Sequence, residues 1–386
     1  MSNSAQGDVL DERKLHSEVR RGASDAVSRG GISIARIDTP SFREWEAIWR
    51  ACDYATFFHS PYWPELWQRF SGGRRESAAE RITFSDGRVA ILPLCFERKL
   101  GGLLSRYASS PEATFGGWIS RDALGPGHAD LLLNRLLDEL PGSLVWRMNP
   151  FDPLVLEAGI RRGLRVRPDS THAVELSADP EALLRNFRNG YKTDIKKAMR
   201  RGHISVEPAT RLEDFRVYYE VYQRTLERWG ERADYVYPWE LFECMAGLGC
   251  PDLTLWLARY DGRIVSGELC LYAKRHVVTW HAATLREYLR ENVAKVQIFR
   301  IIADARERGY AWFDFNPSAG LPGVLVFKES FNAKALPAPL VYVDSPLKRS
   351  IRRVAAAVRV PYAALQLQPL SDFVASVEVP PESTSA

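Results

Sequence analysis

The sequence of 386 residues contains few of the features that would reveal a function directly. Its five cysteines are scattered without CxxC spacing, which predicts neither a disulfide framework nor a zinc site and favours a reducing cytoplasm. No run approaches the ~20 apolar residues of a membrane span, and residues 1–31 lack the apolar core of a signal peptide. There is no dinucleotide fingerprint and no His/Cys cluster, so no metal or redox cofactor is implied.

The two signs of charge are nearly balanced, with 52 Lys and Arg against 48 Asp and Glu. The formal net charge is +4, which does not indicate a DNA-binding protein but allows local basic faces that could meet an anionic donor. A hydrophobic content of 46% supports globular folding, and the length predicts two domains at ~100–200 residues each.

One order of elements can be traced twice, first before about residue 175 and again after about residue 203. Each pass runs strand, two helices, three strands, helix, strand, short helix, strand. A repeat of this size predicts two similar lobes that share a cleft, where ligands tend to bind.

In the first pass, alternation and helical spacing set the element types, and Asp86-Gly87 predicts a tight hairpin turn. The expected strands are 32–37, 77–84, 88–96, 104–108 and 143–148, and the expected helices are 42–52, 61–70 and 128–140.

The second pass has clearer boundaries, with Asp261-Gly262 as its hairpin turn. Its expected strands are 203–208, 253–260, 263–273, 276–283 and 312–315, and its expected helices are 212–229, 238–248 and 292–308.

Between the passes, the segment Pro180 to Arg201 predicts one long helix, capped by Asp179 and ended by Gly202. One face is apolar, and the other is basic through Arg185, Arg188, Lys192, Lys196, Lys197, Arg200 and Arg201. This basic face is either a solvated surface or an electrostatic guide for a phosphate-bearing ligand.

This order of elements resembles the GNAT acyltransferase layout. Its duplication, together with the helix Leu183–Arg201, resembles the FemAB-like branch of peptidoglycan-bridge aminoacyltransferases and related polysaccharide and envelope acetyltransferases. The closest local match is Phe313-Asp314-Phe315-Asn316 followed, after Gly320 and Gly323, by Phe327-Lys328-Glu329-Ser330-Phe331-Asn332, where the family has Phe-Lys-x-x-Phe-Gly. The resemblance spans roughly residues 32 to 344 and implies an α/β chain with a tandem duplicated GNAT fold, two lobes with mixed central sheets.

The resemblance also implies a division of the chain. We expect a disordered tail (1–30), a first lobe on the acceptor side with a degenerate donor site (31–178), a basic linking helix (179–202), a second lobe with the donor and transfer site (203–345), and a basic helix with a disordered end (346–386).

The chain departs from the family in three places. Asn332 replaces a glycine, although asparagine can also adopt the left-handed conformation. No long coiled-coil arm interrupts the second half, which makes acyl-CoA the favoured donor. The loop Thr284–Glu291 lacks the glycine-rich pyrophosphate cradle, so Arg286, Arg290 and Lys295 would have to replace its contacts. Aminoacyl-tRNA, which several relatives use, therefore remains the alternative donor.

Four residues are candidate catalytic groups. The resemblance implies that Lys328 faces the transfer site, where its ammonium would neutralise a tetrahedral intermediate; the alternative is a surface lysine. Asp314 points away from Phe313 and Phe315, either into the cleft or into a structural hydrogen bond. His281 and Glu268 are candidate bases, although a lone histidine is often structural and a mid-strand carboxylate needs a purpose or a partner.

Aromatic and basic residues are candidate binding groups, because rings stack on sugars or bases and arginine grips phosphate. The predicted substrate-binding residues are Tyr62, Trp63, Arg106, Tyr107, Lys192, Arg286, Asn316 and Phe327; for Trp63, core packing is the alternative.

Together these features predict a cytoplasmic acyltransferase that moves an acyl group from acyl-CoA to an amine of a sugar, peptide or envelope-related precursor. The basic segment 346–367 predicts peripheral contact with the inner membrane face, RNA binding, or packing on the second lobe. A non-catalytic RNA- or membrane-binding adaptor is the hypothesis from a different class.

Overall fold

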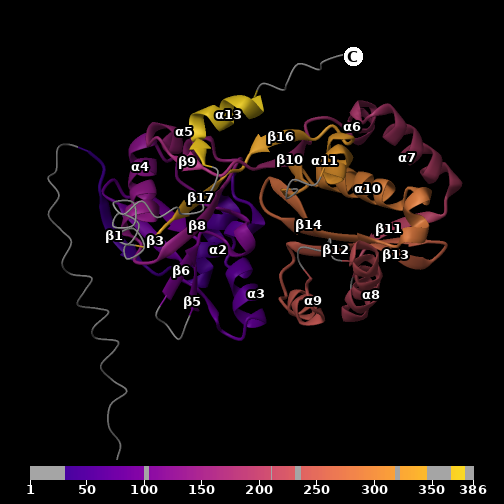
Figure 1. Ribbon diagram of the computed structural model, residues 1–386, viewed down its shortest axis with the longest axis horizontal. Coiled ribbons are helices and arrows are strands. Elements are labelled where there is room, and N and C mark those ends of the chain that lie inside the picture. Colours follow the sequence, from indigo (N-terminus) through magenta and orange to yellow (C-terminus); the bar gives the residue numbers. More distant parts are fainter. Residues whose placement is uncertain are drawn as a thin grey trace, which may run out of the picture.

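The computed structural model describes residues 31–99, 104–209, 211–230, 236–317, 322–345 and 367–378. The predicted tail 1–30 and nearly all of the predicted basic segment 346–367 lie outside the described residues. The chain forms two α/β lobes that lie side by side, one built mainly from the first half and one from the second (Figure 1).

The first lobe contains a sheet of order β17-β8-β6-β5-β2, with β7 also paired to β8, and a smaller sheet of order β1-β3-β4. Its strands are β1 (Ile34–Asp38), β2 (Arg75–Ser77), β3 (Glu80–Phe84), β4 (Val89–Leu92), β5 (Cys95–Lys99), β6 (Leu104–Ala108), β7 (Phe115–Gly116), β8 (Ser143–Met148) and β9 (Arg165–Val166). Its helices are α2 (Phe42–Ala51), α3 (Tyr62–Phe70), α4 (Pro126–Asn134) and α5 (Pro153–Arg161), with short turns η2 (Phe57–His59), η4 (Pro111–Ala113) and η5 (Arg135–Glu139).

The predicted hairpin at Asp86-Gly87 is confirmed, since β3 and β4 pair antiparallel. The predicted strand 88–96 is wrong as one element, because the chain leaves the small sheet after Leu92 and β5 joins the larger one. Pro93 stands at the break, and a proline cannot donate a hydrogen bond to a ladder.

The second lobe contains a seven-stranded mixed sheet of order β11-β12-β13-β14-β15-β10-β16. Its strands are β10 (Ser170–Glu175), β11 (Ile204–Pro208), β12 (Leu253–Tyr260), β13 (Arg263–Tyr272), β14 (His276–Thr284), β15 (Trp312–Asp314) and β16 (Lys334–Pro337). Its helices are α6 (Pro180–Asn186), α7 (Asn189–Arg201), α8 (Leu212–Trp229), α9 (Trp239–Ala246), η7 (Arg286–Glu291), α10 (Val293–Glu307) and α11 (Pro322–Glu329). The hairpin at Asp261-Gly262 is confirmed, and both turn residues have positive φ.

The predicted single helix Pro180–Arg201 is wrong, because the chain breaks at Phe187 between α6 and α7. Asp179 caps α6, and Gly202 ends α7 in the left-handed conformation, as predicted. Phe187 is buried against Phe299 and Phe331, and the N–H of Arg188 donates to the Ser330 carbonyl at 3.0 Å. Tertiary packing therefore outweighs the helical preference of this segment.

The two lobes exchange strands. β10, which precedes residue 178, pairs with β15 and β16 in the second sheet. β17 (Leu340–Val343) returns to the first lobe and pairs with β8, and β18 (Gln368–Pro369) pairs with β9 before the final helix α13 (Leu370–Glu378). The predicted division at residues 178 and 345 therefore does not separate the two sheets.

One hydrophobic core runs through both lobes, joining α2 and α3 of the first lobe to α8, α9 and β14 of the second. Trp63 is fully buried and packs edge-on against Trp280, with ring centroids 5.7 Å apart. None of the helices in the described ranges combines the length and the apolar character needed to cross a bilayer.

Candidate functional site

The second sheet has an opening between β14 and β15, beyond the short stretch over which these two strands pair. These strands pair in parallel only over His276–Val278 and Trp312–Asp314; beyond Val278, β14 continues to Thr284 paired with β13 alone. A β-bulge lies at Trp280, because Leu269 pairs with His281 while Cys270 pairs with Thr279. An interrupted parallel pair of this kind leaves main-chain polar groups available to a ligand.

Lys328 projects from α11 to this opening. Its side chain is 4% exposed, and its ammonium donates a hydrogen bond to the carbonyl of Asn316, just beyond β15. Burial lowers the Lys328 pKa to about 8, against the opposing attraction of Asp314, Asp169 and Glu268. The predicted alternative, a surface lysine, is therefore wrong.

Asp314 and Asn316 form the floor beneath this ammonium. Asp314 is fully buried, and its carboxylate accepts hydrogen bonds from the Thr171 hydroxyl and from the Asn316 N–H at 2.8 Å. Its second oxygen lies 3.2 Å from His276 Nε2. Asn316 has φ +61°, a left-handed conformation that asparagine tolerates and that turns its carbonyl toward Lys328. Asp314 thus holds the turn that presents the Lys328 partner.

Glu268 lies on β13, on the sheet face that α10 covers, and accepts a hydrogen bond from the Thr279 hydroxyl. Its side chain is 5% exposed. Burial raises its pKa to about 7, opposed by the Thr279 hydrogen bond and the Lys328 charge. Glu268 can therefore exchange a proton near neutral pH beside the bulge in β14.

His281 occupies the opposite face of the sheet. Its Nδ1 lies 2.6 Å from the Tyr218 hydroxyl, and its ring is packed by Tyr222, Tyr237 and Phe242. Burial lowers the His281 pKa to about 3, so the ring is neutral at pH 7 and weakly basic. The structure does not bring His281 to Lys328, and its catalytic role stays a prediction.

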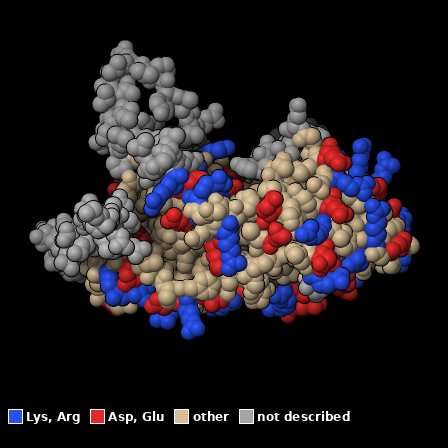
Figure 2. Space-filling model, turned by 90° about the horizontal axis from the view of Figure 1, so that it is seen from below, with Lys and Arg blue, Asp and Glu red and all other residues tan. Residues whose placement is uncertain are grey.

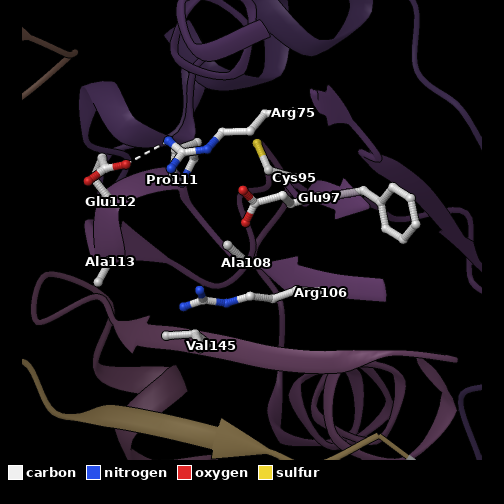
Figure 3. Close-up of a pocket in the computed structure, with 10 residues that line it drawn as sticks. Arg75, Cys95, Glu97, Arg106, Ala108, Pro111, Glu112, Ala113 and Val145 are labelled. Atoms are coloured by element: carbon white, nitrogen blue, oxygen red, sulfur yellow. Dashed lines mark hydrogen bonds and ion pairs between the residues drawn. The ribbon is translucent and has the colours of Figure 1, made fainter. Parts of the chain in front are cut away.

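A second feature lies in the first lobe, a cavity of about 280 Å³ on the sheet of β5, β6 and β8 (Figure 3). Its charged lining residues are Arg75, Glu97, Arg106 and Glu112. Arg75 pairs with Glu112 at 2.6 Å, and the exposed Arg106 guanidinium points into the cavity.

The wall of this cavity is strained and tied to the second lobe. Glu112 and Ala113 have φ of +56° and +50°, which is costly for residues with a Cβ. The Ala113 carbonyl accepts from Arg147 Nε at 2.6 Å, and the same guanidinium binds Asp169 at 2.8 Å. Asp169 is one of the charges that act on Lys328. Polar contacts therefore connect the cavity wall to Asp169, directly before β10 of the second sheet.

The remaining predicted binding residues are dispersed. Trp63 belongs to the core, and Phe327 packs half-buried between Tyr191 and Phe331. The Tyr62 hydroxyl donates a hydrogen bond to Glu46 at 2.8 Å, and burial raises the pKa of Tyr62 to about 12. Tyr107, next to Arg106, packs on the opposite face against Phe96 and does not line the cavity. Lys192 lies on α7 with its ammonium 3.4 Å from the Arg185 carbonyl, and Arg286 is exposed on η7.

The start of α10, where a pyrophosphate cradle would lie, is occupied by side chains. Asn292 precedes the helix with φ +61°, Glu291 pairs with Arg201 of α7 at 3.3 Å, and Lys295 pairs with Asp194 at 2.6 Å. Of the three cations expected to replace the glycine-rich loop, Lys295 is thus already paired to α7.

For several residues, the sequence carries no signal that they belong to the site. Thr171, His172 and Asp169 come from the chain before and within β10, which belongs by sequence to the first pass but lies beside β15. Burial and the nearby Lys328 charge lower the His172 pKa. Within the described ranges, His, Cys, Asp and Glu form no group that could hold a metal ion.

Residues 185–329 match the family described as "Acetyltransferase (GNAT) domain". No curated protein sequence matches the chain.

Among solved structures, the crystal structure of FemX superimposes with a TM-score of 0.63 at 14% identity, covering 82% of this chain and 99% of that chain. L-PGS from Bacillus licheniformis gives a TM-score of 0.45 at 14% identity, covering 75% of this chain and 90% of that chain. The likeness to FemX shows the fold alone.

Proposed function

We propose, from the premise that residues 185–329 form a GNAT acyltransferase domain within a two-lobed, FemAB-like GNAT fold, that the enzyme transfers an acyl group from acyl-CoA to an amine. The buried Lys328 ammonium at the opening between β14 and β15 carries this proposal. A desolvated cation is well suited to stabilise the oxyanion that forms when an amine attacks a thioester.

In the proposed step the uncharged amine attacks the acyl carbonyl, the C–N bond forms, the C–S bond breaks, and the thiolate takes up the proton that the amine loses. Lys328 donates a hydrogen bond to the oxyanion, held by the Asn316 turn that Asp314 secures. Glu268, with a pKa of about 7, supports proton exchange on the α10 side.

We assign the acceptor to the first lobe. The cavity with Arg106 and the Arg75–Glu112 pair suits the anionic part of an amine-bearing sugar, peptide or envelope precursor. A degenerate donor site there is supported by β7, which pairs with β8 beyond β6, at the position where the second sheet is open.

Aminoacyl-tRNA is the second candidate donor. It is supported by the start of α10, where Glu291 and Lys295 are already paired to α7 in place of a pyrophosphate cradle, and by the exposed cations of α7. Native mass spectrometry of the protein offered acyl-CoA and charged tRNA side by side separates these donors, and retention of the RNA alone overturns acyl-CoA.

The adaptor hypothesis has less support than the enzyme hypothesis. The face that carries α3, α8 and α9 shows Lys and Arg interspersed with Asp and Glu, so this face is not a uniformly basic surface for RNA (Figure 2). An RNA-binding adaptor should lose binding steeply as salt rises, and Lys328→Ala should not affect that binding. We place the enzyme in the cytoplasm; membrane contact through residues 346–367 stays a prediction.

Lys328→Ala tests the enzyme directly. We expect kcat to fall by about 10²–10³-fold, the usual loss when an oxyanion-stabilising donor is removed. Lys334→Ala is the matched control. Lys334 is exposed, and its ion pair is long, with Nζ 3.7 Å from Glu175 Oε2. Turnover of each variant is compared at equal folded fraction by circular dichroism, and an unchanged kcat in Lys328→Ala would refute the role of Lys328.

A further inference from the structure

A further cavity, of about 160 Å³, lies in the second lobe at the break between α6 and α7. It is bounded by the end of β10, by α6 and by the turn that follows α11. These elements lie together along the upper side of this lobe (Figure 1). Its apolar lining consists of the buried side chains of Val174, Leu183, Phe187 and Phe331. The proposed transfer uses none of these residues.

One edge of β10 is open at this cavity. β10 continues to Glu175, but its pairing with β16 stops at Ala173 and Lys334. Asn332 would stand opposite Glu175 in this register, but its φ of +60° turns the chain away from β10. Within the described chain, the last residue of β10 therefore has no strand partner on the β16 side.

The main-chain groups of Glu175 point to this open side. The Leu176 N–H donates to the Ala311 carbonyl, next to β15, at 2.8 Å. The His172 carbonyl likewise accepts from the Phe315 N–H at 2.9 Å. Because successive residues of a strand direct their N–H and C=O groups to opposite sides, those of Glu175 face away from β15. One donor and one acceptor of the sheet are thus available to a ligand.

Two carboxamide side chains line the same cavity. Asn186 ends α6, and Asn332 stands where the FemAB-like family has glycine. Both are exposed, and neither carboxamide has a hydrogen-bond partner within the described chain. A carboxamide offers N–H donors and a carbonyl acceptor, as a peptide unit does. The charged side chains of the lining, Glu175 and Lys334, lie 3.7 Å apart as an ion pair, so we assign them no contact with a ligand.

We propose that this cavity, the β10-edge cavity, binds a short extended stretch of peptide. The peptide main chain adds to β10, accepting from the Glu175 N–H and donating to the Glu175 carbonyl. The carboxamides of Asn186 and Asn332 bond the adjoining amide groups of the peptide, and a small apolar side chain enters the apolar lining.

A sugar is the competing ligand, since hydroxyl groups can also bond carboxamides. The open edge of β10 favours the peptide, because an added strand continues the hydrogen-bonding geometry of the adjoining ladder. A phosphate is disfavoured, because the paired charges of Glu175 and Lys334 present no net positive charge.

Phe331 and Asn332 follow Lys328 by three and four residues, so a bound peptide adjoins the turn that ends the Lys328 helix. For the proposed enzyme, this position favours a peptide rather than a sugar as part of the acceptor. That consequence rests on the proposed function, whereas the peptide binding itself does not.

Ligand-observed NMR titration of the full chain tests the binding without any turnover. The probes are N-acetyl-dialanine amide, the same compound with both alanine nitrogens methylated, and glucose. We expect saturable binding of the first probe and no saturable binding of glucose. The methylated probe should bind at least about tenfold more weakly, because it cannot donate to the Glu175 carbonyl.

Two variants each remove one carboxamide. Asn332→Gly does so at a left-handed φ that glycine adopts freely, so the fold is retained. Asn186→Ala does so at the end of α6. Each should weaken binding of the unmethylated probe about fivefold, as the loss of one neutral hydrogen bond does.

Matched controls exist for both substitutions. Asn292→Gly alters an asparagine with φ +61° before α10, and Asn189→Ala alters an exposed asparagine of α7; neither residue lines the cavity. Both controls should bind the probe like the wild type, and thermal unfolding establishes that all variants are folded.

Wild-type affinity in either Asn332→Gly or Asn186→Ala would overturn the proposal, because the peptide would then bind elsewhere in the chain. So would equal binding of the methylated probe, a preference for glucose, or no saturable binding of N-acetyl-dialanine amide.

Discussion

Glu268 and Lys328 are both buried, and burial shifts their pKa values toward each other, to about 7 and about 8. Burial favours the neutral form of each group, whereas the charge of the other group and a hydrogen bond favour the ionised form. Near neutral pH the pair therefore stands close to a change of charge state. This is the property that a transfer site needs to stabilise an oxyanion and to move a proton.

The Glu268 carboxyl should make stability depend on pH. Its pKa is raised in the folded protein from 4.5 to about 7, so the folded state binds more protons between these values and the contribution of Glu268 falls as pH rises through this window. Glu268→Gln removes that loss, so the variant should gain stability relative to wild type from pH 5 to pH 7 and remain level above it. Urea denaturation at a series of pH values measures the difference, and a difference independent of pH would contradict the assignment.

At the scale of elements, close backbone approach decides how helices cover the second sheet. Gly267 of β13 lies beneath Tyr218 of α8, and a Cβ added to Gly267 would lie 2.2 Å from the Tyr218 ring. Tyr218 in turn holds His281 through its hydroxyl. The contact of α8 with β13 and β14 therefore depends on the absence of a side chain at one position.

Gly267→Ala should destabilise the protein by about 1–3 kcal/mol, since the buried Tyr218 ring must move to relieve the overlap. Gly190→Ala is the matched control. Gly190 lies in α7 with open space around its Cβ position, so this change should stabilise by about 0.5–1 kcal/mol. Chemical denaturation measures both variants, and equal effects would show that the contact with Tyr218 is unimportant.

At the scale of the whole molecule, the lobes are joined by exchanged strands and by a common core. β10 completes the second sheet and β17 the first, so each lobe contains a strand from the other half of the chain. Trp63 and Trp280 meet within the shared core. The relative position of the cavity in the first lobe and Lys328 in the second is therefore fixed by covalent and packing constraints together.

Neither half should fold alone. Fragments 1–178 and 179–386, each missing a strand, should show no cooperative unfolding by circular dichroism. A refolded equimolar mixture should regain the cooperative transition, because each fragment supplies the strand that the other lacks. Cooperative unfolding of either fragment by itself would contradict this expectation.

Local patterns in the sequence determined most elements and both hairpins. Asp86-Gly87 and Asp261-Gly262 specify their turns through backbone conformations that few residues adopt, and periodicity fixed α8 at Leu212–Trp229. The Phe-Lys segment pointed to Lys328 by resemblance. These features depend on residues close together in the chain.

Long-range packing set the break at Phe187, the exchange of β10 and β17, and the surroundings of Lys328. Thr171 bonds Asp314, and the His172 carbonyl accepts from the Phe315 N–H, across more than a hundred residues, and no periodicity records such a pairing. The physical reason is that dihedral preference and amphipathicity act over a few residues, whereas strand pairing and burial depend on which distant segments come to share one interior.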